Sequence, residues 1–296
     1  MTSIKELDVN HLIGKKIGTS TILSELARGG MAIIFIAYQR TLKRRIAVKI
    51  LPKTLLTNQK AELFQQEAEA AAILSHPNII QIYDVGEVEE FIYFTMQLIQ
   101  GQPLTHLLQG IKKQVLPSKR FMPVKVIIQI MTQILDALDY AHQQGIIHRD
   151  IKPDNIMVEE HTQRPIITDF GVAKVLRDAK EDHSIARGSP LYMPPEQIID
   201  ESTDERSDLY AAGIMLFEML VPKLPLPKFG SYEDLLKQKL LNKRGIFLKK
   251  PSEINPFLNM MMDQIVLKAI AYEPEKRFVN CCELKNTLEE YQKKYL

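Results

Sequence analysis

Three polar residues in one short run have the types and the spacing that phosphoryl transfer from a nucleotide requires: Asp150, Lys152 and Asn155. The carboxylate of Asp150 can take a proton from a hydroxyl group, and the amide oxygen of Asn155 can bind a metal ion. A second carboxylate, Asp169, follows the apolar run Ile166–Ile167, as a metal ligand at the end of a strand would. The run therefore predicts a metal-dependent site of phosphoryl transfer.

Composition limits the class of protein. The chain has 296 residues, of which 45% are hydrophobic and 25% charged, so it can bury a substantial core in one large domain or two lobes. Lys and Arg number 38 against 36 for Asp and Glu, and the net charge of +2 predicts no binding to nucleic acid or to an anionic membrane. Cys281 and Cys282 are adjacent and poorly placed for a disulfide, which favours free thiols in a reducing compartment.

Neither a secretory signal nor a membrane span is predicted. Met1–Asn10 is polar, and the most apolar long stretch, Tyr210–Val221, contains Glu218 and stops at Pro222. That stretch is too short to cross a bilayer and is better interpreted as a buried helix. We therefore expect a cytoplasmic catalytic unit, and a membrane anchor after Leu296 in a longer protein stays open.

The periodicity of apolar residues predicts strands in the first third of the chain. Ser20–Tyr38 and Arg45–Leu51 are rich in β-branched residues, and a tight turn is expected at Gly29 and Gly30. One helix is predicted over Ala61–Ser75, which is rich in strong helix formers. Two more strands are predicted over Ile79–Val85 and Phe91–Leu98, with a polar break at Gly86–Glu90 between them.

Beyond Gly101 the pattern becomes helical. Apolar residues recur at helical spacing from Val124 to His142, and Gly145 is placed to cap that helix. The helix leads directly into the polar run that contains Asp150. Gln109–Pro123 is predicted to form an enlarged loop before it.

Taken together, these motifs resemble those of the eukaryotic-like serine/threonine protein kinases, and of their bacterial branch in particular. The resemblance covers residues 17–291 and implies an α+β bilobal fold with a nucleotide cleft between the lobes. A small antiparallel β-sheet lobe with one helix would take about residues 17–98, and a larger, mainly α-helical lobe about 102–291, with a hinge at about 97–101. It implies ATP and Mg²⁺ as cofactors.

The resemblance also implies the catalytic roles. Asp150 would orient and deprotonate the acceptor hydroxyl, and Lys152 would neutralise charge that grows on the transferred γ-phosphoryl group. Asn155 and Asp169 would coordinate Mg²⁺. His148 is interpreted as a packed structural residue, because Asp150 already fills the role of base.

For the nucleotide, the resemblance implies that Lys49, paired with Glu67, is held against the α- and β-phosphates. Adenine would lie among apolar side chains, with backbone groups of the hinge as hydrogen-bond partners and Met96 as gatekeeper. The residues assigned to the nucleotide besides Lys49 are Leu26, Ala27, Arg28, Gly29 and Gly30 of the glycine-rich loop, Ile34, Ala47 and Met157 around adenine, and Gln97 and Ile99 in the hinge.

Gly188–Glu196 resembles the end of an activation segment, which in this family receives the substrate. Lys152 and the segment's small hydroxyl residue Ser189 indicate serine or threonine in proteins as the acceptor. Arg149 beside the catalytic aspartate suggests control by phosphorylation, and Ser184 is the predicted site. Self-association for autophosphorylation is a further expected partnership.

Two contacts within the helical lobe are also implied by the resemblance. Glu196 would form a buried ion pair with Arg277, and Asp208, at the start of the buried helix, would hold the backbone of the catalytic loop.

Two other classes of function remain open. Ala27 and Ala32 stand where the family has the first and third glycines of its loop, which keeps a nucleotide-binding pseudokinase or scaffold as the alternative. The third reading is a small-molecule phosphotransferase of related fold, against which the segment Gly188–Glu196 argues. Activity on proteins separates these readings.

Overall fold

The computed structural model of this chain describes residues 9–29, 32–53, 65, 68–69, 71–88, 91–170, 190–199 and 203–296. They divide into two compact units. The described residues up to Gln100, with Phe170, form the first unit, and Gly101–Asp169 with those from Pro190 onward form the second. The helix predicted over Ala61–Ser75 lies largely outside the described residues.

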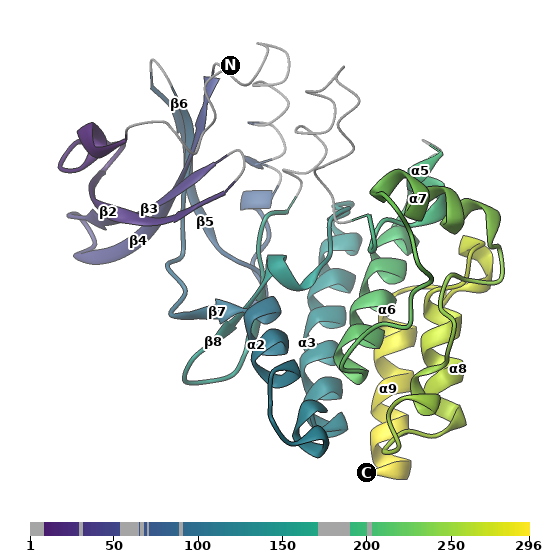
Figure 1. The fold of residues 1–296 in the computed structure, drawn as a ribbon. Coiled ribbons are helices and arrows are strands. Elements are labelled where there is room, and N and C mark those ends of the chain that lie inside the picture. Colours follow the sequence, from purple (N-terminus) through teal and green to yellow (C-terminus); the bar gives the residue numbers. More distant parts are fainter. Residues whose placement is uncertain are drawn as a thin grey trace. The chain divides into compact units, whose positions relative to one another are not determined.

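The first unit is built on an antiparallel sheet that curls through the purple and blue strands of Figure 1. The six strands lie in the order β1-β2-β3-β4-β6-β5, so neighbours in sequence are mostly neighbours in space. This confirms the predicted small sheet. Its strands are β1 (Lys16–Ile17), β2 (Ser20–Arg28), β3 (Ile33–Gln39), β4 (Arg44–Pro52), β5 (Ile82–Glu87) and β6 (Phe91–Met96).

The predicted break at Gly86–Glu90 begins too early, because β5 starts at Ile82 and continues through Gly86 to Glu87 before β6 begins at Phe91. Gly86 pairs with Tyr93 on β6, and a Cβ at this glycine would lie only 2.6 Å from the Tyr93 hydroxyl. The glycine is therefore a strand residue that makes room for an aromatic ring, rather than a turn.

The strand register places different sets of residues on the two faces of this sheet. One face packs into a core with the short N-terminal helix η2 (Asn10–Leu12) and includes Ile33, Phe35 and Val48. Residues paired across an antiparallel sheet share a face, so Ile34 with Lys49, and Ala47 with Met96, lie on the opposite one. Because successive side chains of a strand point to opposite faces, β3 and β4 separate core residues from the predicted nucleotide-binding residues.

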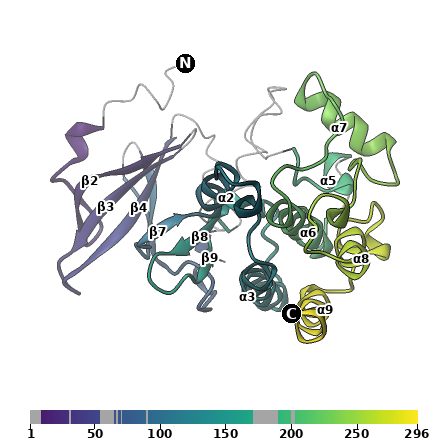
Figure 2. The ribbon, with the colours of Figure 1, turned by 60° about the horizontal axis from the view of Figure 1, so that its bottom comes forward.

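The second unit is mainly helical. Its central helices lie side by side in both views: α3 contacts α6 and α9, and α8 contacts α6 and α9 (Figures 1 and 2). The helices are α2 (Leu104–Lys112), α3 (Val124–Gln143), α5 (Pro195–Ile198), α6 (Arg206–Leu220), α7 (Tyr232–Leu241), α8 (Met260–Ala269) and α9 (Cys281–Tyr295), with short 3₁₀ turns η4 (Pro117–Arg120), η5 (Pro153–Asn155), η6 (Pro251–Glu253) and η7 (Pro274–Lys276).

The buried helix predicted over Tyr210–Val221 is confirmed as part of α6, whose side chains are almost all buried. Gly213 lies where α6 and α8 pack most closely, since a Cβ there would be 2.8 Å from the Cβ of Ala269 and 2.8 Å from Cγ2 of Ile270. The predicted helix from Val124 is also confirmed. It ends at Gln143, and Gly145 follows with a φ of 74°.

Two features of this unit differ from the prediction. The predicted loop Gln109–Pro123 is partly helical, because α2 continues to Lys112 and η4 occupies residues 117–120. A small antiparallel sheet of β7 (Gly101–Pro103), β8 (Ile156–Glu159) and β9 (Pro165–Ile167) was not predicted beyond a strand at Ile166–Ile167. Such short strands carry too little periodicity to be recognised from sequence.

One helical stretch within the described residues, Ser118–Gln143, is long and apolar enough to span a membrane by length and composition alone. In this fold 56% of that apolar window is buried, and the stretch packs against α6 and α9. It serves as the core helix of the second unit.

Candidate functional site

A buried histidine shapes the loop between α3 and β8. The backbone N–H of Asp150 donates to Nδ1 of His148 over 3.2 Å, so the ring proton is on Nε2, which donates to the carbonyl of Thr168 over 2.8 Å. Both ring nitrogens are therefore occupied by backbone groups. This confirms the structural role predicted for His148, and the ring joins the loop to the segment after β9.

Asp208 holds the backbone of the same loop, as predicted. Its carboxylate accepts hydrogen bonds from the backbone N–H groups of His148 and Arg149 over 2.8 and 2.7 Å and from Nε2 of His142 over 2.8 Å. Burial alone would raise the pKa of Asp208, but the hydrogen bonds that its carboxylate accepts from His142 and from the His148 backbone outweigh burial and lower that pKa. The positive φ of Arg149, 65°, is stabilised by this anchor.

Asp150, Lys152 and Asn155 form one cluster in that loop. Lys152 Nζ lies 2.7 Å from Oδ2 of Asp150, and the Asn155 amide donates to the same oxygen over 3.1 Å and to the Asp150 carbonyl over 2.8 Å. In the described part of the chain, the two contacts to the Asp150 carboxylate both fall on Oδ2 and leave Oδ1 as the second acceptor. Because the amide nitrogen of Asn155 points to Asp150, its oxygen is the atom available to a cation.

Asp169 lies at the same end of the small sheet as Asn155. The residues Ile156 and Ile167 pair across β8 and β9, and the Thr168 N–H donates to the Asn155 carbonyl over 2.9 Å. Asn155 directly precedes β8 and Asp169 directly follows Thr168, so the two predicted metal ligands share one edge. Among the described residues no group of three or more His, Cys, Asp or Glu side chains could hold a metal. Two oxygen ligands suit Mg²⁺, which keeps waters and binds substrate phosphates.

The residues predicted to bind the nucleotide from the first unit share the second face of its sheet. Lys49 is only 8% exposed, and its ammonium lies 5.6 Å from the centre of the Phe94 ring, opposite it in the register. Ile34 and Ala47 flank it on this face. The backbone N–H of Gln97 already donates to the Gln81 carbonyl over 2.9 Å, so the Gln97 carbonyl is its remaining backbone group.

The predicted glycine-rich loop joins β2 to β3. The Gly29 N–H donates to the Ala32 carbonyl over 2.9 Å, and the register of β2 shifts between Glu25 and Ala27 just before the loop. Leu26 is largely exposed there, and Arg28 Nη2 contacts Glu25 Oε2 over 2.7 Å. Gly30, Glu67, Ser184 and Ser189 lie outside the described residues, as does the Lys49–Glu67 pair.

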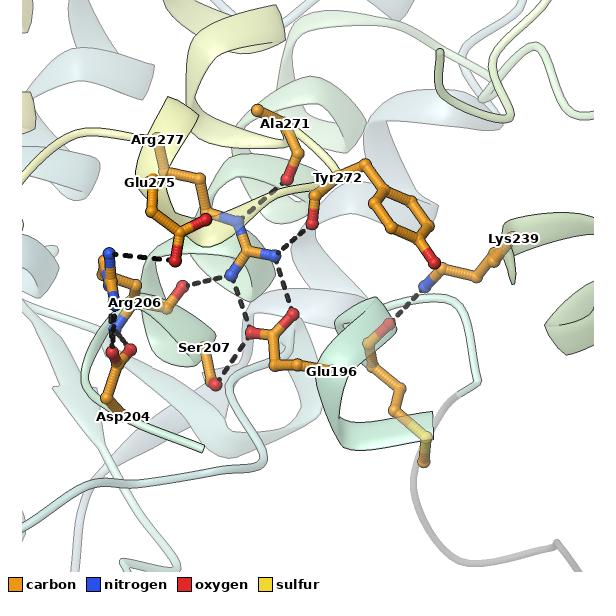
Figure 3. A network of polar contacts seen from close by, with 10 residues as sticks. Glu196, Asp204, Arg206, Ser207, Lys239, Ala271, Tyr272, Glu275 and Arg277 are labelled. Atoms are coloured by element: carbon orange, nitrogen blue, oxygen red, sulfur yellow. Dashed lines mark hydrogen bonds and ion pairs between the residues drawn. The ribbon is translucent and has the colours of Figure 1, made fainter. Parts of the chain in front are cut away.

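The predicted ion pair between Glu196 and Arg277 is confirmed and buried (Figure 3). Two parallel hydrogen bonds of 2.7 Å join the guanidinium to the carboxylate. The guanidinium also donates to the carbonyls of Arg206, Ala271 and Tyr272, so all five of its N–H donors are used. This pair ties α5 to the start of α6 and to η7.

Two anchors of the segment before α5 were not predicted from the sequence. The hydroxyl of Tyr192 donates to Glu218 on α6, which also pairs with Lys112 of α2 over 2.8 Å. Lys239 of α7 donates to backbone carbonyls of the same segment. The signal for Lys239 was its place on the apolar stripe of α7 with Leu235 and Leu236, where a solvated lysine is not expected.

Residues 20–288 match the protein kinase domain model. The serine/threonine-protein kinase PrkC of Bacillus subtilis is 35% identical over 90% of this chain, and PknB of Mycobacterium leprae is 32% identical over 89%. The chain spans about 40% of the length of these curated relatives. The crystal structure of the Mycobacterium tuberculosis PknI kinase domain is 25% identical and superposes with a TM-score of 0.73, covering 94% of this chain and 98% of that one. The chain therefore belongs to the protein kinase family, and its domain is of the bacterial serine/threonine type.

Proposed function

We propose that this chain is the catalytic domain, over about residues 17–291, of an active enzyme that transfers the γ-phosphate of ATP to serine or threonine hydroxyls of proteins. Membership of the family implies ATP as the phosphoryl donor and, typically, Mg²⁺. The observation that carries the proposal is the cluster of Asp150, Lys152 and Asn155 beside Asp169. An intact cluster of this kind supports phosphoryl transfer over nucleotide binding alone.

The acceptor hydroxyl would approach Oδ1 of Asp150. Lys152 and Asn155 fix the carboxylate through Oδ2, so its other oxygen can orient the hydroxyl and take its proton as the bond to phosphorus forms. Lys152 keeps its ammonium within reach of charge that develops on the transferred group. Because the transition state needs little covalent help, positioning and electrostatics are what the loop supplies.

Asn155 and Asp169 are the residues that would hold Mg²⁺. When bound, the ion would neutralise phosphate charge. Their oxygen donors at one edge of the β8–β9 sheet fit this role. Both residues are positioned by backbone contacts rather than by long flexible stems, since Asn155 is buried and Thr168 is bonded to it.

On the first unit, the face of the sheet that carries Ile34, Ala47 and Lys49 would bind the nucleotide. The buried ammonium of Lys49 serves the phosphates, and the apolar side chains serve adenine. The Gln97 carbonyl would accept from the base, and Ile99 would supply a second backbone group. Met157 of β8 and the loop residues Leu26 to Gly30 complete the predicted set.

Three finer proposals follow from the sequence. The acceptors include the chain itself, with self-association bringing two copies together. Phosphorylation at Ser184 would act through Arg149 by charge pairing. A reducing, cytoplasmic setting suits the two free cysteines, of which Cys281 is fully buried.

The test is intact-mass spectrometry of phosphatase-treated protein incubated with ATP, Mg²⁺ and a generic protein acceptor. We expect mass steps of one phosphate in the parent and in Glu160→Ala, which removes an exposed carboxylate in the turn after β8, and none in Asp150→Ala. ATP binding without phosphate transfer in the parent would favour the pseudokinase suggested by Ala27 and Ala32. Transfer only to a metabolite would revive the small-molecule enzyme.

A further inference from the structure

Lys239 is a buried cation in the middle of α7. The residue is only 2% exposed, and its ammonium donates to three backbone carbonyls, those of Pro190 at 3.1 Å, Leu191 at 2.8 Å and Met193. Figure 3 shows one of these hydrogen bonds as a dashed line from Lys239. The Tyr210 ring lies beneath it, with 5.0 Å between Nζ and the ring centre. An ammonium has three donors, and here each has a carbonyl acceptor.

Such a residue is costly as mere packing. Burial lowers the pKa of Lys239 to about 7, against a smaller opposing effect of Glu196. An apolar side chain of similar length would fill the same space without desolvating a charge. The geometry that offsets this cost is the convergence of three carbonyl oxygens on one point, which a planar guanidinium would match poorly.

Within the described residues, the backbone supplies no partners for these three carbonyls. Prolines at 190, 194 and 195 lack N–H groups, and no backbone N–H of the described residues donates to the three carbonyls. Buried carbonyls require partners, so the lysine supplies what a helix or a strand would otherwise provide. Lys239 of α7 thus holds three carbonyls of residues 190–193, and Tyr192 is held separately by Glu218.

We propose that Lys239 is a positioning residue that fixes the segment Pro190–Met193 in the shape that receives the acceptor peptide. The proposal rests on the proposed function, because the segment acts on acceptors only if the chain phosphorylates proteins. Among the described residues, the hydrogen bonds of Lys239 all go to this segment and none goes to the Asp150 cluster. Its loss should therefore weaken acceptor binding while leaving the handling of ATP intact.

The test compares Lys239→Met with Lys237→Met, a change of an exposed lysine on the same helix. KM for an acceptor peptide, KM for ATP and acceptor-independent hydrolysis of ATP are measured for both and for the parent. For Lys239→Met we expect peptide KM to rise about tenfold or more, with ATP KM and hydrolysis within about twofold of the parent. Lys237→Met should match the parent throughout.

A parallel fall in peptide phosphorylation and ATP hydrolysis would overturn the proposal, because it would show general damage. An unchanged peptide KM would overturn it as well. If Lys239→Met does not fold, Lys239→Gln, which retains two donors, should show a smaller rise in peptide KM with the same split.

Amide hydrogen exchange separates this proposal from the proposed function. Exchange at Leu191, Tyr192 and Met193 should quicken at least about tenfold in Lys239→Met and not in Lys237→Met. This result is independent of activity. Fast exchange together with an inactive parent would refute the kinase assignment and leave the anchoring role intact, whereas unchanged exchange would refute the anchoring role itself.

Discussion

Replacing Arg277 by methionine should destabilise the helical unit more than any other change to a single ion pair in the described structure. The change removes both 2.7 Å hydrogen bonds to Glu196 and leaves that carboxylate buried, with Ser207 Oγ, at 3.0 Å, as its remaining hydrogen-bond partner among the described residues. Methionine fills much of the volume, so the effect measures lost polar contacts rather than a cavity.

The magnitude follows from two sources. Breaking a buried ion pair by removing one partner costs about 3–5 kcal/mol. The carbonyls of Arg206, Ala271 and Tyr272 also lose a charged donor, and each unsatisfied carbonyl adds on the order of 1 kcal/mol where water cannot reach it. We expect the free energy of unfolding to fall by about 4–6 kcal/mol, since relaxation will return part of the sum.

Changing the other partner of the ion pair should lower the free energy of unfolding by less. Glu196→Gln keeps an acceptor for the guanidinium, and Arg277 retains its three carbonyl partners, so about 1–3 kcal/mol is expected. We therefore expect Arg277→Met to lower the free energy of unfolding more than Glu196→Gln does. The difference arises because Arg277 donates hydrogen bonds to four groups, whereas Glu196 accepts them from two.

Unfolding in urea, followed by circular dichroism because the sequence has no tryptophan, would measure these differences. Arg206→Met is the matched control: its ion pair with Asp204, 2.6 Å long, is partly exposed and should be worth less than about 1 kcal/mol. If Arg277→Met and Arg206→Met destabilised the protein equally, burial of the Glu196–Arg277 pair would not be what stabilises this region.

Three further outcomes are expected. Asp208→Asn should lower the free energy of unfolding by about 2 kcal/mol, measured by thermal melting, because the single amide oxygen cannot accept from all three donors. The same change should lower the rate of phosphate transfer more than tenfold, measured by intact mass. Gly213→Ala should cost about 1–3 kcal/mol in urea through contact with α8, whereas Gly110→Ala, with open space around it, should be neutral or stabilising. The folded protein should bind fewer protons than the unfolded chain between pH 7 and pH 10, because burial lowers the pKa of Lys239 from 10.5 to about 7. Its stability relative to Lys239→Met should therefore rise by about 1 kcal/mol per pH unit across that window in urea titrations, and a flat difference would contradict the lowered pKa.

Local patterns in the sequence predicted the elements that carry strong periodicity or motifs. Helix α3 follows from apolar residues at helical spacing and a closing glycine, and strands β3 and β4 follow from runs rich in β-branched residues. Asp208 and the Glu196–Arg277 pair were predicted from family resemblance, because each belongs to a short motif. What these patterns report is local geometry and residue type.

Other contacts could not be predicted because they join residues that are distant in sequence and have no motif. Lys239 and its carbonyl partners lie on either side of α5 and α6 in the sequence, and the residues next to Lys239 do not indicate which carbonyls it contacts. Gly86 was taken for a break because glycine usually weakens strands, yet here the Tyr93 ring across the sheet requires it. In both cases the deciding partner is set by tertiary packing.

The buried polar contacts of the helical unit converge on one short irregular segment. Residues 190–196 are held by Lys239 from α7, by Glu218 from α6 and by Arg277 beyond η7, through charged groups of which Lys239 and Arg277 are buried and Glu218 is half-buried. A fold that needed only stability would place apolar side chains at these positions, because they desolvate at lower cost. Charged anchors instead specify a single backbone shape, since carbonyls, a hydroxyl and a carboxylate must each meet a partner in the right direction. That shape is most useful if the segment binds another chain, and disrupting any one anchor should therefore affect acceptor binding before it affects the handling of ATP.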